Sequence, residues 1–331
     1  MSLVNTSTFS DFVANMKIVW LESFEEVPRA AAQLFKTKAS KEKITDFSSL
    51  DMPRFASEKD EGDDARSASP SQGYRKTMTK YRVQKTASIT WEMRTYDKYS
   101  MMMDKIRGLG ALAANRMEID MTHRFTFFAD TAYTNMDGRS VTTTVGDGLA
   151  LGSTVHTVTG SSTTFRNIVA NNPTLSRGGL EAAETLFATQ MINMSGERVV
   201  VRPDTLLIPE NPVYENIALE YLNSTAAPDA AHAGVTNVYK GKYRLVKLPD
   251  WATTAAGARN SAKENYWALV SLKDASAMCE ISEEPRLIAP SQGSNAEDFD
   301  SDNWKFKTTA AYGIEIVTPH WIVFSKGDGT A

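Results

Sequence analysis

Large apolar side chains recur at helical spacing at the start of the chain, where the steps between them are mostly three or four residues: Phe9, Phe12, Val13, Met16, Val19, Trp20 and Phe24. This spacing predicts an amphipathic helix or arm between Phe9 and Phe35, followed by a flexible or extended connection. Because the body begins far along the chain, we predict that this apolar face lies on a neighbouring copy. Burial of each large side chain there would contribute about 1.5 to 3 kcal/mol. The predicted contacts are Phe12, Met16, Val19, Trp20 and Phe24.

From Tyr81 to Arg94 apolar and polar residues alternate with period two, which predicts a strand. No acid lies between Asp64 and Glu92, and the bases concentrated there are Arg66, Arg75, Lys76, Lys80, Arg82 and Lys85. An acidic run, Glu58 to Asp64, comes directly before them. One interpretation is two solvated faces. The other is an extended hairpin over residues 73–95 that lies across an adjacent copy, as described next.

In that second interpretation the apolar face of the hairpin, with Val83, Ile89 and Trp91, is buried on the neighbour. The bases then face acids of that neighbour, such as the Glu58 to Asp64 run or Glu283 and Glu284. Exposed ion pairs contribute only about 0 to 1 kcal/mol each, so these charges should set register and salt sensitivity more than strength.

A long helix follows, with apolar residues at steps of three or four: Ile106, Leu109, Ala113, Met117, Met121, Phe125 and Phe128. Beginning near Lys98, it would span about 30 residues, or roughly 45 Å. Gly108 and Gly110 weaken it early, which indicates close packing of another backbone there.

The second half of the chain mixes helical and strand patterns. Ser176 is a predicted N-cap of a helix that Gly196 ends, and Asn211 with Pro212 begins another helix. Short apolar runs predict two strands on either side of Pro203, and further strands in 239–248 and 265–272. Two closing strands, in 304–316 and 320–325, are expected to pair or to bend back. These elements indicate an α+β chain.

Composition narrows the function classes. The chain has 331 residues, of which 42% are apolar and 23% charged, and a net charge of -4. This balance argues against a surface that binds nucleic acid throughout and favours protein partners. Cys279 is the only cysteine, so an intrachain disulfide is excluded, and we expect a small buried apolar side chain made in a reducing compartment. We find neither a membrane-length apolar run nor a signal peptide, and expect a soluble, intracellular protein.

One stretch, residues 146–169, holds the residue types of a hydrolase triad: Asp147, Ser153 and His156. The serine is not in a Gly-x-Ser-x-Gly elbow, and no phosphate-binding glycine loop occurs. The four histidines, His123, His156, His232 and His320, are too far apart for a metal motif. We therefore predict no catalytic, cofactor or metal site, with the hydrolase as the alternative.

An arm and a long loop do not bury themselves on their own subunit. Ordering them costs roughly 1 to 2 kcal/mol per residue, which neighbouring copies must offset. These features favour a self-assembling structural protein.

The order of these parts resembles the major capsid protein of tailed bacteriophages, of the Mu-like major head subunit type. The resemblance spans nearly the whole chain and rests on three segments: "DGLALGSTVHTVTGSSTTFRNIVANNPTLSRGGLEAA", "VRPDTLLIPENPVYENIALEYLNS" and "FDSDNWKFKTTAAYGIEIVTPHWIVFSKG". It implies the Hong Kong type phage capsid fold, in which His156 lies in a connection and not in a triad. We expect no counterpart here of the large N-terminal scaffolding domain that some relatives carry before the arm, which implies a separate scaffolding protein.

The resemblance also implies an organisation. The expected parts are an N-terminal arm (1–57), an extended β-hairpin loop (58–97), a spine helix opening the peripheral domain (98–170), an axial α/β domain (171–300) and returning peripheral strands (301–331). It implies pentamers and hexamers that close into an icosahedral shell around double-stranded DNA, held by nonspecific contact and assembled in the bacterial host cytoplasm. A separate scaffolding protein, a portal and a decoration protein are the other implied partners. An encapsulin-like compartment is the rival interpretation within the same fold.

Overall fold

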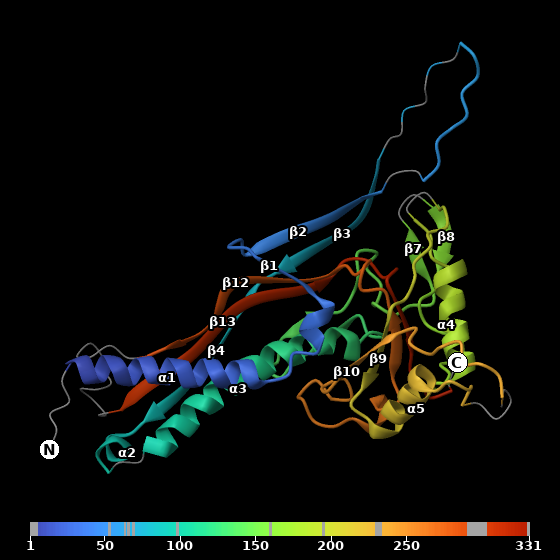
Figure 1. Cartoon of the computed structure of the whole chain (residues 1–331). Coiled ribbons are helices and arrows are strands. Elements are labelled where there is room, and N and C mark those ends of the chain that lie inside the picture. The colour runs from blue at the N-terminus through green and yellow to red at the C-terminus, as the bar shows by residue number, and fades with distance from the viewer. Residues whose placement is uncertain are drawn as a thin grey trace.

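The computed structural model describes residues 6–51, 54–62, 64, 67, 70–96, 99–158, 161–193, 196–228, 234–289 and 303–329. It is a mixed α+β chain, as predicted, with an elongated part that carries two long helices and a more compact part near the C-terminus (Figure 1). Among the helices described, none is both long and apolar enough to cross a membrane.

The two long helices lie side by side (Figure 1). Helix α1 (Thr6–Glu26) packs against α3 (Tyr99–Thr126), which confirms the predicted spine. A β-carbon on Gly110 would stand 2.5 Å from the carbonyl oxygen of Trp20, so this glycine allows the close approach that the sequence indicated. Gly108 has no such neighbour. A short 3-10 helix, η1 (Ala31–Leu34), follows α1.

The apolar face of α1 is buried within its own chain, which corrects the prediction of burial on a neighbour. Met16, Trp20 and Phe24 are 0%, 4% and 8% exposed and pack with the first half of α3. Val19 packs at the edge of the same cluster. The periodicity identified the apolar face correctly, but it carries no information on which partner covers that face. The side chain of Phe12 lies outside the described residues, so its contact stays a prediction.

A two-stranded hairpin projects from the body (Figure 1). It consists of β2 (Ile44–Asp51) and β3 (Ser71–Thr79), paired antiparallel from Ile44 opposite Thr79 to Asp51 opposite Ser71. The hairpin therefore begins earlier than predicted. The strand predicted from Tyr81 onward is β4 (Tyr81–Ile89), but it pairs with the body, and helix α2 (Trp91–Thr95) begins at Trp91. Alternation identifies a strand without identifying its partner.

The larger sheet has the order β1-β12-β13-β4. Strand β1 (Lys36–Ala39) runs parallel to β12 (Ala277–Ile288), and β13 (Trp304–Ile316) pairs antiparallel with both β12 and β4. Strand β12 was missed, and it contains Glu283 and Glu284. Its alternation is broken by acids, a proline and two register shifts, so the sequence pattern is weak.

The second sheet has the order β10-β9-β11-β14. Its strands are β10 (Arg244–Leu248), β9 (Thr205–Pro209), β11 (Trp267–Val270) and β14 (Ile322–Ser325). The two closing strands thus belong to different sheets and do not pair with each other. Residues before Pro203 form only an isolated bridge between Ile192 and Arg198, so the first of the two strands predicted there is wrong.

Two helices accompany the second sheet, and their starts follow the predicted caps. Helix α4 (Arg177–Thr189) begins after Ser176, whose hydroxyl accepts from the Gly179 N–H at 3.2 Å. Helix α5 (Pro212–Asn223) begins after Asn211, whose side chain accepts from the Val213 N–H. Helix α4 ends before Gly196, which has a φ of +77° in a later turn.

Two small hairpins and a 3-10 helix complete the described elements. They are β5 (Ala132–Thr134) with β6 (Ser140–Thr142), β7 (His156–Val158) with β8 (Ser161–Phe165), and η3 (Ser261–Lys263).

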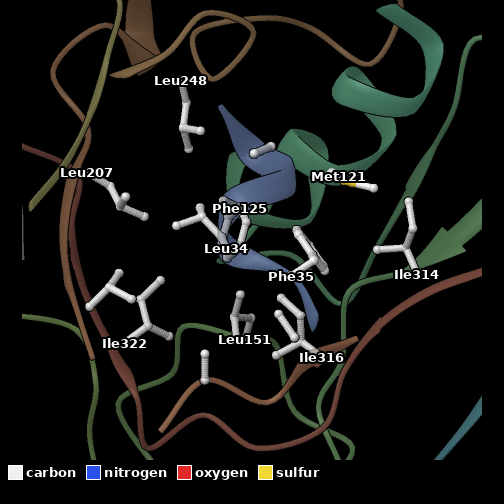
Figure 2. Packing of buried hydrophobic residues seen from close by; sticks show 14 of the residues in the cluster. Leu34, Phe35, Met121, Phe125, Leu151, Leu207, Leu248, Ile314, Ile316 and Ile322 are labelled. Carbon is white, nitrogen blue, oxygen red and sulfur yellow. The ribbon is translucent and has the colours of Figure 1, made fainter. Parts of the chain in front are cut away.

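The main core lies where η1, the end of α3 and both sheets meet. Figure 2 shows Leu34 and Phe35 beside Phe125 of α3, with Ile316 and Ile322 from the two sheets nearby. Cys279 belongs to this core and is fully buried, as predicted, and burial raises the pKa of its thiol to about 12.

Candidate assembly surface

The root of the hairpin is held by a buried ion pair. Lys80 lies between β3 and β4, and its Nζ stands 2.8 Å from Glu280 Oε2 of β12, with both side chains at most 3% exposed. The same ammonium donates to the carbonyl oxygens of Glu42 at 2.7 Å and Ser40 at 3.1 Å. Burial would raise the pKa of the Glu280 carboxyl, but hydrogen bonds from Lys80 and Thr45 outweigh it and lower that pKa.

A second charged group lies four residues before Lys80, on the same face of β3. Lys76 Nζ lies 3.7 Å from Glu315 Oε2 and donates to Thr144 Oγ1 at 2.9 Å. Arg124 of α3 approaches the other oxygen of Glu315 at 3.6 Å. Burial raises the pKa of Glu315, against the opposing effect of the two bases, and burial also lowers the pKa of Lys76.

The remaining bases of the predicted contact face outward. Arg75 pairs with Asp46 of β2 at 3.1 Å, and Arg82 pairs with Glu283 at 3.1 Å, all within the same chain. The prediction that Lys76 and Lys80 meet acids of a neighbour is corrected by their buried intrachain pairs, whereas for the exposed Arg75 and Arg82 the contact with a neighbour stays a prediction. The acidic partners of the two lysines lie on strands 200 or more residues away along the chain, which local sequence does not reveal.

Two predicted contact residues stay exposed. Lys85 is exposed on β4 and makes no ion pair with any residue that the structure describes. Trp91 is 46% exposed, with its ring edge-on to Tyr96 at 6.1 Å between centroids. Both are open to a neighbour.

The end of the hairpin contrasts with its root. We call residues 55–62 the tip, and every one of them is exposed, including Phe55 at 66%. The tip carries the acids Glu58, Asp60 and Glu61. Just before it, Arg54 donates to the Arg198 carbonyl oxygen at 2.6 Å, so the body contacts the hairpin up to this residue.

A cavity of about 1050 Å³ opens between α3, β4, β13 and the β5–β6 hairpin. We call it the α3 groove. Its lining combines exposed apolar side chains, such as Leu112 and Met136, with the bases Lys85, Arg116 and Arg139. Arg116 is paired with Asp120 and Asp137, whereas Arg139 is exposed and lies over the Tyr81 ring at 5.6 Å.

The three hydrolase residue types do not form a triad. His156 is fully buried, with Nδ1 2.7 Å from Asp147 Oδ2 and Nε2 3.1 Å from Asn167 Oδ1. The Ser153 hydroxyl instead accepts from the Val155 N–H at 3.2 Å. Both ring nitrogens of His156 are occupied, and the Ser153 hydroxyl does not face them. His156 and Asp147 therefore lack the nucleophile of a triad, and they instead tie together the connection between α3 and the body.

The other histidines show no metal arrangement. No cluster of three or more metal-binding side chains occurs in the described ranges. Burial lowers the pKa of His123 to about 4, so it stays neutral, beside Thr253 at 3.0 Å. His320 Nε2 lies 2.7 Å from the Ile192 carbonyl oxygen, and His232 falls outside the described residues.

Sequence reasoning missed Glu280 and Glu315, which hold the hairpin root. Each acid stands inside an otherwise apolar strand pattern, "AMCEI" and "YGIEIV", and such an interruption often indicates a buried partner. That signal was present but did not say which base is the partner.

Comparisons with known proteins agree with this architecture. A family model described as phage capsid protein matches residues 76–323. The capsid structure of the cyanophage P-SCSP1u aligns with a TM-score of 0.51 at 12% identity, covering 88% of this chain and 85% of that chain. A structure from Gordonia phage Cozz aligns with a TM-score of 0.51 at 8% identity, covering 89% and 85%.

A structure from Mycobacterium phage Bobi aligns with a TM-score of 0.50 at 11% identity, covering 90% of both chains. At such identities these three likenesses show the fold alone. No curated protein sequence matches the chain.

Proposed function

The chain belongs to the phage capsid protein family, and from this premise we propose that it is the major head protein of a tailed phage or prophage. In this proposal it assembles as pentamers and hexamers into an icosahedral shell around double-stranded DNA. The Mu-like head subunit is the proposed subtype, on the strength of the three quoted sequence segments.

The observation that carries the proposal is the hairpin. Two strands alone are marginal in water, and the described residues that follow Arg54, 55–62, are all exposed. The tip exposes an aromatic ring, and Leu50 on β2 is 73% exposed. Such a projection is consistent with a chain whose neighbours supply the missing contact area.

We propose that the acidic tip of one copy lies along the α3 groove of an adjacent copy. Phe55 would meet the apolar floor, and the acids that follow it would meet Lys85 and Arg139. This pairing keeps the charge complementarity predicted from sequence and keeps Lys85 as one of its bases, with Arg139 in place of the other predicted bases. Phe12 and Trp91 remain proposed residues of the contacts between neighbouring copies in the shell.

The other partners follow from the role of a head protein. A separate scaffolding protein, a portal and a decoration protein are proposed, together with nonspecific contact to packaged DNA. With a net charge of -4, DNA contact would be confined to local basic surfaces. Assembly in the bacterial host cytoplasm suits the single buried thiol, and we propose no enzymatic activity.

The test is to express the chain in bacteria, alone and with a candidate scaffold, and to examine the products by negative-stain microscopy. Closed isometric shells are expected, and particles from infected or induced cells should contain nuclease-protected DNA. Shells that contain a cargo enzyme in place of DNA would instead indicate an encapsulin-like compartment. Subunits that stay monomeric under every condition would contradict the proposal.

A further inference from the structure

Alternate residues from position 74 to position 80, along β3 and directly after it, form one largely buried face between the hairpin and the body. The four side chains are Tyr74, Met78 and the two lysines described above, Lys76 and Lys80. Tyr74 donates from its hydroxyl to the Thr157 carbonyl oxygen at 2.9 Å, and it packs directly over Gly146. The intervening residues, such as Arg75, face outward. The root is thus anchored along its whole length, in contrast to the exposed tip.

Lys80 has a partner for every donor. Its three ammonium hydrogens have Glu280, Glu42 and Ser40 as acceptors, at 2.8, 2.7 and 3.1 Å. Glu280 in turn accepts from Thr45 Oγ1 at 2.7 Å. No other ion pair of the described hairpin residues has both side chains at most 3% exposed.

The acceptors lie on separate segments that meet where the hairpin leaves the body. Ser40 and Glu42 precede β2, Thr45 lies in β2, and Glu280 lies in β12. Backbone bonds close the same junction, because the Lys80 N–H donates to the Lys43 carbonyl oxygen at 3.0 Å. One ion pair therefore fixes both legs of the hairpin to the sheet.

Close packing limits rotation about this junction. A β-carbon on Gly313 of β13 would stand 2.8 Å from Met78 Cγ and 3.0 Å from Lys80 Cγ. Strand β3 thus passes β13 at the distance that only a glycine allows. An apolar side chain at position 80 would fill this space, but it would lack the directional bonds that define one angle.

We infer that Lys80 and Glu280 are positioning residues that set the direction of the β2–β3 hairpin within the single subunit, before any neighbour binds. The consequence for assembly rests on the proposed function, because a hairpin that is already oriented loses less freedom when it meets the adjacent copy. The orientation itself is a property of the isolated chain. It can therefore be tested without a shell.

The experiment measures distances between two spin labels in dilute, unassembled subunits. Labels are placed at Asp60→Cys in the tip and Leu112→Cys on α3, both exposed positions, while the buried Cys279 stays unlabelled. The wild-type root should give one narrow distance peak. Glu280→Gln and Lys80→Met should each lose that peak and give a broad distribution, whereas Asp46→Asn, which removes the exposed partner of Arg75, should retain it.

Thermal unfolding separates orientation from folding. If a single variant fails to fold, the double variant Lys80→Met with Glu280→Leu removes both charges together, and it should fold yet still give the broad distribution. A narrow peak in every folded variant would overturn the inference, whatever the assembly state of the wild type. Failure of the wild type to assemble would contradict the proposed function and leave a broadened distribution as support for the positioning role.

Discussion

The root and the tip of one hairpin show two opposite uses of charge. At the root, Lys80 and Glu280 are buried together and every ammonium hydrogen has an acceptor. At the tip, Glu58, Asp60 and Glu61 are exposed on either side of the exposed Lys59, and none of these acids forms an ion pair with a residue that the structure describes. Charges that already have intrachain partners stabilise the subunit, whereas charges without partners are available to another copy. A cluster of charges in the sequence is an assembly signal only where its partners are missing.

Excision of the tip should give the largest effect on assembly. Replacement of residues 55–67 by a short glycine-serine turn removes the proposed contact and leaves the anchored face of β3 intact. We expect the loss of shells in negative-stain images and a thermal unfolding midpoint close to that of the wild-type subunit. Normal shells from the excised chain would contradict the prediction that the tip contact is needed for assembly.

The charge of the tip is tested separately by the triple variant Glu58→Gln, Asp60→Gln and Glu61→Gln, which should weaken assembly and reduce its salt dependence.

We expect the apolar face of α1 to stabilise the isolated subunit, whether or not a shell has formed. Trp20→Ala leaves a cavity against α3 and should destabilise the isolated subunit by about 3 to 5 kcal/mol, measured by denaturant unfolding. Ile18→Ala is the matched control, because this residue of the same helix is 54% exposed. Equal stabilities for the two variants would show that α1 leaves α3 in solution, and would restore the prediction of burial on a neighbour.

Acid should weaken the root through Glu280. Its pKa is lowered in the folded chain, so its contribution is present above the unfolded value of about 4.3 and is lost as the pH falls through the folded value. Glu315 has the opposite sign, because its pKa is raised. We expect wild-type stability to fall more steeply than that of Glu280→Gln between about pH 5 and pH 3. Parallel profiles in thermal unfolding would mean that Glu280 is not ionised in the folded root.

The exposed pair of the hairpin should show the smallest effect. Asp46→Ala removes the partner of Arg75, and both side chains are about half or more exposed. Water and salt already screen such a pair, so the unfolding midpoint should stay unchanged within error. A clear loss of stability would show that the outward face of the hairpin also orients it.

Local patterns predicted the elements that depend on local physics. The spacing from Ile106 to Phe125 predicted α3, and Ser176 and Asn211 predicted two helix starts from the acceptors that their side chains offer. Strand β12 was missed because it is irregular and carries acids. The two closing strands were found, but their assignment to different sheets depends on partners far away in the chain.

The candidate site was predictable only in part. The sequence showed a basic cluster, an acidic run and an amphipathic start, and all three exist. Which base meets which acid was not readable, since Lys80 and Glu280 are joined by folding alone across 200 residues. The same holds for Trp20. The helical spacing of the apolar residues around it predicts that it is buried, but it does not predict that α3 is the element that covers it.

The most direct test is a cryo-electron microscopy reconstruction of the purified particles. We predict an icosahedral shell of this chain, in which each root keeps its Lys80–Glu280 contact and each tip lies in the α3 groove of an adjacent copy. A shell in which the tips extend into solvent would contradict the proposed contact. A preparation without any closed shell, with or without a scaffold, would contradict the central claim that this chain builds a capsid.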